Sequence, residues 1–150
     1  MFEKLNFDMK KVHPTLVVST MSSGKSTLIN ALVGTSLLPS MNRACTARSL
    51  AILDNDMKSQ FAIHAVDSEG KYSYIEKASK KIVADFNKSN DISEMIIEGE
   101  IEGVRNSKKA MLLIDTPGIN NSMDLTHEMA TNKVLDEYPE RLILYVINAQ

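Results

Sequence analysis

A short run of small and basic residues carries the clearest chemical signal in this sequence. It lies between an apolar segment, 15–19, and an amphipathic segment, 25–34, and consists of Ser22, Ser23, Gly24, Lys25, Ser26 and Thr27. Such a loop between a strand and a helix lets successive backbone N–H groups surround a phosphate, and the helix adds the positive end of its dipole. Lys25 would then reach the β- and γ-phosphates of a nucleotide, and the Ser26 hydroxyl would bind Mg²⁺. The run predicts a phosphate-binding loop, with a plain strand-to-helix turn as the alternative.

The loop departs from the usual phosphate-loop pattern at one position. In G-x-x-x-x-G-K-[ST] the first residue is glycine, whereas this sequence has Ser19 there. Glycine serves at such a position by allowing a positive φ or a close approach of the backbone. Because serine is also small, we expect the departure to be tolerated.

A second stretch, Asp115-Thr116-Pro117-Gly118, supplies groups that complement the loop. It follows Lys109 and the apolar run 110–114, which predicts a buried strand. Asp115 would reach Mg²⁺ through a water molecule, and the N–H of Gly118 would donate to the γ-phosphate and sense its loss on hydrolysis. The two stretches together indicate a nucleoside triphosphate site far more specifically than either does alone.

Bulk composition sets the class of protein. The 150 residues are 43% hydrophobic and 24% charged, which is typical of one globular domain. The net charge of −2 offers no electrostatic footprint for nucleic acid. The single cysteine, Cys45, has no partner for an internal disulfide, which fits a reducing compartment. With no signal peptide in 1–11 and no apolar run longer than 142–147, we expect a cytoplasmic domain without a membrane span.

Hydrophobic periodicity predicts alternating helices and strands. Apolar residues at helical spacing indicate helices at 25–34, ending at Gly34, at 72–90, and from Asp124 or Thr126 to about Tyr138. Strands are predicted at 15–19, 49–54, 60–67, 95–104, 109–115 and 141–148. The strands 49–54 and 60–67 flank a turn-rich spacer and are predicted to form a hairpin. The expected fold is α/β, a mostly parallel sheet flanked by helices with one antiparallel pair.

Several segments resemble the bacterial members of the dynamin superfamily. The segment from Ser22 to Leu32 reads S-S-G-K-S-T-L-I-N-A-L, and Leu37-Leu38-Pro39 and Cys45-Thr46-Ala47 follow it. The D-T-P-G stretch is similar to the third conserved element of the translation-factor-like GTPases. The resemblance covers nearly the whole chain, although 55–105 matches only in pattern. It implies that 1–150 is the N-terminal portion of a dynamin-type G domain, a P-loop NTPase with a Ras-like mixed sheet.

The resemblance implies a site for GTP or GDP with Mg²⁺ and the hydrolysis of GTP to GDP and phosphate. Residues Ser22 to Thr27 would bind the phosphates, and Ser26, Thr46 and Asp115 would lie around Mg²⁺. Thr46 and Gly118 would position the attacking water through backbone groups. Ser22 matches a serine that helps to hold a monovalent cation when two G domains meet face to face, which implies a homodimer through that face. Membrane remodelling and membrane association would belong to the full-length protein only.

Two departures from the family pattern bear on turnover. Met21 stands where eukaryotic dynamins have a glutamine that supports catalysis, and Ile119 follows D-T-P-G where Ras-like proteins have a water-orienting glutamine. We therefore expect turnover to be slow or dependent on dimerisation.

The sequence leaves the base specificity open. The guanine-reading N/T-K-x-D element would follow a later strand, and the sequence ends at Gln150. Asn132-Lys133 is followed by Val134-Leu135-Asp136, which is one residue too long for that element. A P-loop ATPase or kinase is therefore one alternative. Another is a truncated fragment that folds and self-associates through an unpaired edge at 142–147 without hydrolysing nucleotide.

Overall fold

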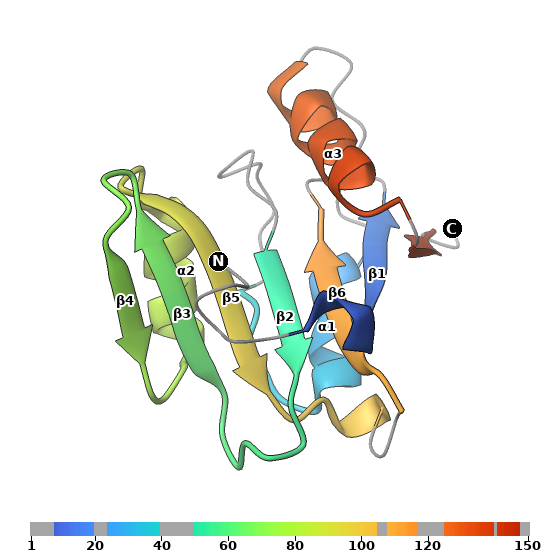
Figure 1. Cartoon of the computed structure of the whole chain (residues 1–150), viewed down its shortest axis with the longest axis horizontal. Coiled ribbons are helices and arrows are strands. Elements are labelled where there is room, and N and C mark those ends of the chain that lie inside the picture. The colour runs from blue at the N-terminus through green and yellow to red at the C-terminus, as the bar shows by residue number, and fades with distance from the viewer. Residues whose placement is uncertain are drawn as a thin grey trace.

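A seven-stranded mixed sheet forms the centre of the molecule (Figure 1). The computed structural model describes residues 8–19, 24–39, 50–104, 108–116, 125–139 and 141–147. The strands are β1 (Val12–Ser19), β2 (Leu50–Asp54), β3 (Ala62–Asp67), β4 (Tyr72–Ile75), β5 (Ile92–Gly99), β6 (Ala110–Asp115) and β7 (Leu142–Val146). The α-helices are α1 (Lys25–Val33), α2 (Lys80–Lys88) and α3 (Leu125–Glu137), with short 3₁₀ helices at η2 (Met9–Lys11) and η3 (Glu102–Val104). The strands lie in the order β4-β3-β5-β2-β6-β1-β7.

Parallel and antiparallel pairings are mixed in this sheet. β1 pairs in parallel with β6 and with β7, and β2 pairs in parallel with β5. β2 pairs antiparallel with β6, and β3 pairs antiparallel with β4 and β5. Together with the helices on the sheet, this arrangement confirms the predicted α/β class with a mixed sheet. The sheet is not mostly parallel with one antiparallel pair, however, because three of the six pairings among the described residues are antiparallel.

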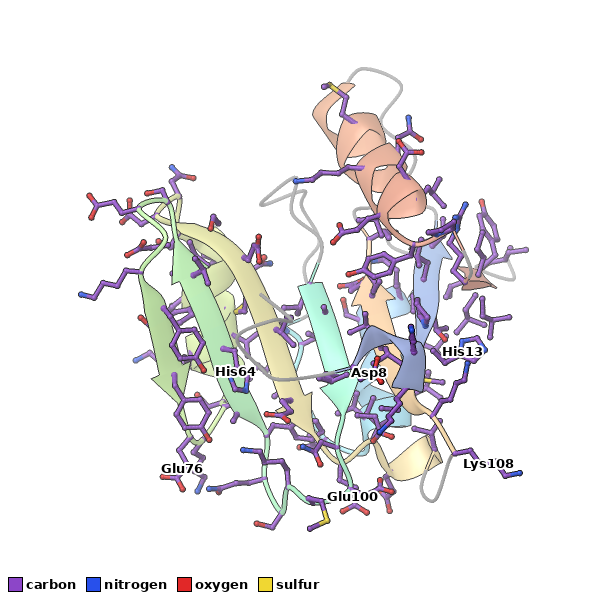
Figure 2. All side chains as sticks on the ribbon, viewed as in Figure 1. Asp8, His13, His64, Glu76, Glu100 and Lys108 are labelled. Carbon is purple, nitrogen blue, oxygen red and sulfur yellow. The ribbon has the colours of Figure 1, made fainter. Side chains whose placement is uncertain are left out.

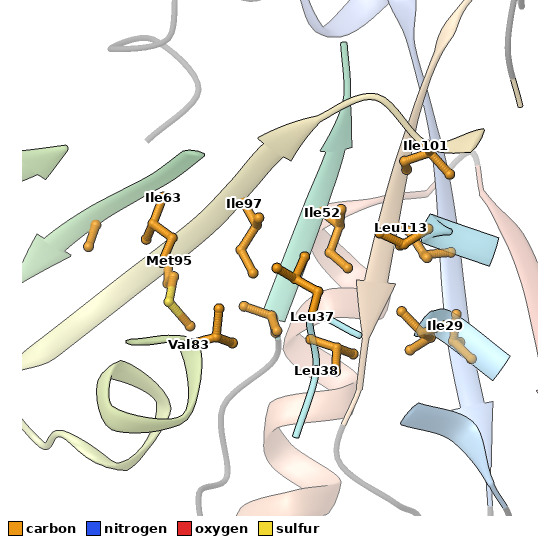
Figure 3. Close-up of a cluster of buried hydrophobic side chains, with 14 residues drawn as sticks. Ile29, Leu37, Leu38, Ile52, Ile63, Val83, Met95, Ile97, Ile101 and Leu113 are labelled. Atoms are coloured by element: carbon orange, nitrogen blue, oxygen red, sulfur yellow. The ribbon is translucent and has the colours of Figure 1, made fainter. Parts of the chain in front are cut away.

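Each face of the sheet has its own hydrophobic cluster because side chains alternate along a strand. On one face, Val17 of β1 packs in a cluster with Ile29 of α1 and Val83 of α2 (Figure 3). On the other face, Leu16 of β1 belongs to a cluster with Val134 of α3. Helices α1 and α2 therefore cover one face, as Figure 1 shows. Helix α3 packs against the other face through Val134.

Helix α1 begins and ends at glycines with left-handed backbone conformations. Gly24 precedes the helix with φ 84°, and Gly34 ends it with φ 80° and donates its N–H to the Asn30 carbonyl. The Asn30 side chain fixes the chain after the helix: its Oδ1 accepts from the N–H groups of Leu37 and Leu38 at 3.0 and 2.7 Å. The predicted helix and its glycine cap are confirmed.

The predicted hairpin of 49–54 with 60–67 is wrong, because β5 lies between β2 and β3. Ile52 and Leu53 of β2 are fully buried on opposite faces of the sheet, which places β2 at the centre of the sheet with a neighbour on each edge. Those neighbours are β5 and β6, so β3 pairs with β4 and β5 instead.

The predicted helix 72–90 is wrong in its first part, which forms β4. The Asp67 carboxylate accepts from the N–H groups of Glu69 and Lys71 at 3.0 and 2.8 Å and so closes a turn between β3 and β4. Helix α2 begins only after Ser79, whose hydroxyl accepts from the Ile82 N–H at 3.3 Å as an N-cap. The predicted strand 95–104 also differs, since β5 runs over Ile92–Gly99 and the chain then turns into η3.

The remaining strand and helix predictions agree with the structure, except that β1 begins at Val12 rather than at residue 15. Strand β6 and helix α3 lie where they were expected, whereas the two proposed caps of α3, Asp124 and Thr126, lie outside the described side chains. Within the described residues β7 pairs only with β1, and its Leu142, Ile143 and Tyr145 side chains are exposed, as the edge hypothesis expected.

Across the described part of the chain, no helix has both the length and the apolar character needed to cross a bilayer.

Candidate functional site

The two sequence stretches meet because their strands are neighbours. β1 and β6 pair in parallel with Val17 opposite Asp115, so their carboxyl ends lie at the same edge of the sheet. β1 leads toward α1, whose first residue is Lys25, and β6 ends at Asp115. In sheets of this kind, ligands bind beyond the carboxyl ends of the strands.

The Lys25 amine is the centre of the contacts at this edge. It donates to Asp115 Oδ1 and, at 2.6 Å, to the carbonyl oxygen of Thr116. The side chains of Lys25 and Asp115 are 14% and 19% exposed, so this ion pair is mostly shielded from water. Burial raises the pKa of Asp115, although the charge and hydrogen bond of Lys25 act in the opposite direction.

Thr116 is a site residue that the sequence reasoning missed. Its side chain is buried, with 1% exposure, and its hydroxyl donates to the Val17 carbonyl at 2.8 Å. Its backbone N–H also approaches that carbonyl, at 3.3 Å. The threonine is visible in D-T-P-G, but its partner is a backbone atom of β1 that only the β1–β6 register identifies. Thr116 therefore anchors the end of β6 on β1 and fixes the carbonyl that contacts Lys25.

The N-terminus of α1 faces the site without a side-chain cap. Gly24 provides no capping hydrogen bond, and its carbonyl accepts from the Leu28 N–H at 2.9 Å. The first N–H groups of a helix lack intrahelical partners and attract anions. A Cβ at Gly24 would meet nothing within 4 Å, so glycine is needed there for its left-handed φ of 84° rather than for space.

The structure brings together only part of the predicted site. Lys25 and Asp115 are in contact, and Gly24, Ser26 and Thr27 lie beside Lys25 at the start of α1. The remaining predicted residues, Ser22, Ser23, Thr46 and Gly118, lie outside the described residues.

The donor set at this edge suits Mg²⁺ rather than a transition metal. The described residues contain no group of three or more histidine, cysteine or acidic side chains that could hold a metal ion by themselves. Mg²⁺ is usually bound through one or two oxygen side chains together with water and substrate phosphates. The Ser26 hydroxyl and the Asp115 carboxylate are oxygen ligands of this type, so the residues present fit that ion.

Comparison with known proteins identifies the family. The model of the dynamin family matches residues 15–150. The chain belongs to the dynamin family. This is a family of GTPases, and the match confirms the resemblance carried by the phosphate loop and D-T-P-G. A guanine nucleotide is therefore the ligand class that the family indicates for this site.

Individual relatives agree with the family match. A bacterial dynamin-like protein of Nostoc punctiforme is 29% identical in an alignment of 118 residues. The match covers 71% of this chain and 17% of that protein. Two solved structures of an oligomerised bacterial dynamin pair, described as sensing and tethering membranes at long range, show the same fold. Their TM-scores are 0.63 and 0.58, at 18% and 20% identity, over 95% and 90% of this chain. The matched regions are 22% and 20% of those chains, so this dynamin-family sequence spans about a fifth of its relatives' length.

Proposed function

We propose that this part of a dynamin-family G domain binds GTP together with Mg²⁺ and hydrolyses it to GDP and phosphate. The observation that carries the proposal is the meeting of the Lys25 amine with Asp115 and the Thr116 carbonyl beyond the carboxyl ends of β1 and β6. A lysine amine, a carboxylate and an uncapped helix N-terminus at one edge of a parallel strand pair suit the binding of a metal–triphosphate.

Each group in this arrangement has a distinct role in the proposal. Lys25 binds the β- and γ-phosphates, and the N–H groups at the start of α1 bind phosphate oxygens. Ser26 and Asp115 would hold Mg²⁺, and the bound ion would supply positive charge beside the transferred phosphoryl group. Rate enhancement then comes from positioned charges and dipoles rather than from a protein nucleophile.

Four further residues belong to the proposal through the family resemblance. They are Ser22 and Ser23 in the phosphate loop, Thr46 at the metal and the attacking water, and Gly118 at the γ-phosphate. Ser22 would also help to hold a monovalent cation between two G domains.

For the full-length protein we propose a cytoplasmic homodimer that forms through the G-domain face and remodels membranes. The family match and the oligomerised bacterial dynamins of similar fold support this proposal.

The test is calorimetric titration of the full-length protein with GTP, GDP and ATP, each with Mg²⁺, followed by a phosphate-release assay. We expect a preference for guanine nucleotides and release of phosphate from GTP. Equal binding of ATP and GTP would reject the guanine assignment and favour an ATPase or kinase. Binding of GTP without phosphate release, also after dimerisation at high protein concentration, would contradict the hydrolase.

The Lys25→Ala variant tests the phosphate loop itself. A hydrogen bond to a charged group contributes about 1.5–3 kcal/mol, so the affinity for GTP should fall roughly 10- to 150-fold. Lys81→Ala, which removes an exposed lysine on α2, is the matched control and should bind like the wild type. Unchanged affinity in Lys25→Ala would contradict the loop assignment.

A further inference from the structure

The contacts of the Lys25 amine have a consequence for how the site is filled. An ammonium group has three hydrogen-bond donors, and two of them are directed at the end of β6, to Asp115 Oδ1 and the Thr116 carbonyl. The amine that the proposed function assigns to the phosphates is thus already engaged by oxygen atoms of the protein.

We propose that the end of β6 is a seat that holds the Lys25 amine and competes with phosphates for it. The seat consists of the Asp115 carboxylate and the Thr116 carbonyl. Lys25 leaves it only when another cation takes over the Asp115 carboxylate. This proposal rests on the proposed function, because it concerns the same lysine and the same nucleotide.

The seat is rigid, so Lys25 must move away from it rather than carry it along. Thr116 is buried and holds the Val17 carbonyl with both its hydroxyl and its N–H. The preceding residue pairs, Leu16 with Ile114 and Val17 with Asp115, belong to the parallel β1–β6 ladder. Leu16 and Ile114 are both buried, which fixes this ladder in the core. Thr116 is accordingly a positioning residue that acts on Lys25 through its own carbonyl.

Electrostatics make the departure of Lys25 unfavourable unless Asp115 gains a new partner. The Asp115 side chain is only 19% exposed, and Lys25 is the only cationic side chain that the described residues place in an ion pair with it. Removing one partner of a poorly hydrated ion pair leaves the other charge uncompensated. Binding of a triphosphate without a metal therefore leaves Asp115 unpaired, whereas a divalent cation at Asp115 removes this penalty.

The experiment measures the affinity for GTP in EDTA and in Mg²⁺ for the wild type and Asp115→Asn. Asparagine keeps the shape of the side chain but removes its charge, so Lys25 is held less firmly. We expect Asp115→Asn to bind metal-free GTP roughly tenfold more tightly than the wild type, because Lys25 no longer has to give up one charge-assisted contact when it turns to the phosphates. The same variant should gain little from Mg²⁺. Unchanged or weaker binding of metal-free GTP by the folded variant would overturn the proposal.

A second pair of variants separates the seat from direct repulsion between Asp115 and the phosphates. The comparison of Lys25→Ala with Lys25→Ala/Asp115→Asn is made at millimolar GTP in EDTA, by nuclear magnetic resonance titration. If Asp115 acts by holding Lys25, the gain from Asp115→Asn disappears when Lys25 is absent. An equal gain in both backgrounds would show that Asp115 repels phosphate directly, and it would overturn the proposal.

Thr116 provides a test that leaves both charged residues in place. Thr116→Val removes the hydroxyl donor to Val17, and Thr116→Ser retains it. We expect Thr116→Val to raise the metal-free affinity for GTP about two- to thirteenfold relative to the affinity in Mg²⁺, since one hydrogen bond contributes about 0.5–1.5 kcal/mol. Thr116→Ser should restore the wild-type ratio. A merely structural role would lower the urea midpoint of Thr116→Val without changing that ratio.

The outcomes distinguish the two proposals. If the wild type and Lys25→Ala bind GTP equally in Mg²⁺, the proposed function fails at its own residue. If Lys25→Ala binds more weakly in Mg²⁺ but neither Asp115→Asn nor Thr116→Val gains metal-free affinity, the nucleotide site stands and the seat is refuted.

Discussion

Glu98→Ala should be strongly destabilising, because the Glu98 carboxylate on β5 is the acceptor at the centre of a polar network that includes His64 of the neighbouring strand β3. Its Oε1 accepts from the Asn55 amide at 2.7 Å, and its Oε2 lies 2.8 Å from His64 Nε2. The other ring nitrogen of His64 lies 2.7 Å from the Tyr72 hydroxyl. His64, labelled in Figure 2, and Glu98 are only 7% and 9% exposed at their side chains.

The magnitude follows from the donors that Glu98→Ala would leave without an acceptor. A buried donor without an acceptor costs about 1–3 kcal/mol, and the His64 Nε2–H would be one of these. Asn55 is half-buried and would partly recover its hydrogen bond with water. The expected total is about 2–4 kcal/mol, which lowers the urea midpoint by about 1–2 M for a slope near 2 kcal/mol/M.

Glu98→Gln is the matched control. Its amide oxygen still accepts from Asn55, and its N–H donates to His64 Nε2 when the ring adopts the other tautomer, with Nδ1–H donating to Tyr72. Because the network can be satisfied in this way, we expect a cost of about 1 kcal/mol. Urea unfolding at neutral pH, followed by circular dichroism, measures both variants. Equal destabilisation of the two variants would refute the network as the cause.

The same carboxylate predicts a dependence on pH. Burial by itself raises the pKa of Glu98, but the hydrogen bonds from Asn55 and His64 and the charges of His64 and Lys58 outweigh it, so the pKa lies below its ordinary value of 4.5. A carboxyl group whose pKa is lower in the folded state stabilises the fold above the unfolded pKa and loses this effect as pH falls through the folded pKa. The stability difference between wild type and Glu98→Gln should therefore be constant above about pH 5.5 and shrink below pH 4.5. A difference that grows on acidification would contradict this sign.

Two further predictions concern packing and capping. Gly99→Ala should cost about 1–3 kcal/mol in urea unfolding, since a Cβ there would lie 2.4 Å from Cδ1 of Phe61; the cost should shrink in a Phe61→Leu background, and an equal cost in both would argue against this clash. Arg141→Ala should accelerate hydrogen exchange at the end of α3, because Arg141 Nη1 donates to the carbonyls of Leu135 and Tyr138 at 2.7 and 2.6 Å. Unchanged exchange there would show that the arginine does not cap the helix.

Elements with a strong local pattern were predictable from the sequence. The run 110–114 is apolar enough to specify a buried strand, and α1 has both helical spacing and a glycine at its end. These signals are local. A strand that is buried on both faces has a continuous apolar run, and a helix that is buried on one face has apolar residues at helical spacing.

The order of the strands was not predictable in the same way. A turn-rich spacer after β2 favours a hairpin with the next strand. Instead, β2 pairs with β5, which begins only at Ile92, after the β3–β4 hairpin and helix α2. Its place depends on contacts between distant residues, such as Asn55 with Glu98 and Phe61 against Gly99. The helix prediction for Tyr72–Ile75 was wrong for a different reason. Over four residues helical and strand periodicity cannot be told apart, and the Asp67 turn decides for the strand.

The candidate site shows where motif reasoning succeeds and where it ends. Lys25 and Asp115 can be predicted as site residues from their side chains and positions. Lys25 lies at the start of the helix that follows β1, Asp115 lies at the end of β6, and parallel pairing brings the carboxyl ends of both strands to one edge of the sheet. Thr116 acts through backbone carbonyls, its own and that of Val17, and a carbonyl has no residue type by which to recognise it. The charged residues Lys25 and Asp115 can thus be predicted from the sequence. The carbonyl oxygens of Thr116 and Val17, which hold them in place, can be identified only from the register of β1 and β6. The Thr116→Val and Thr116→Ser pair therefore examines the part of the site that the motif alone does not contain.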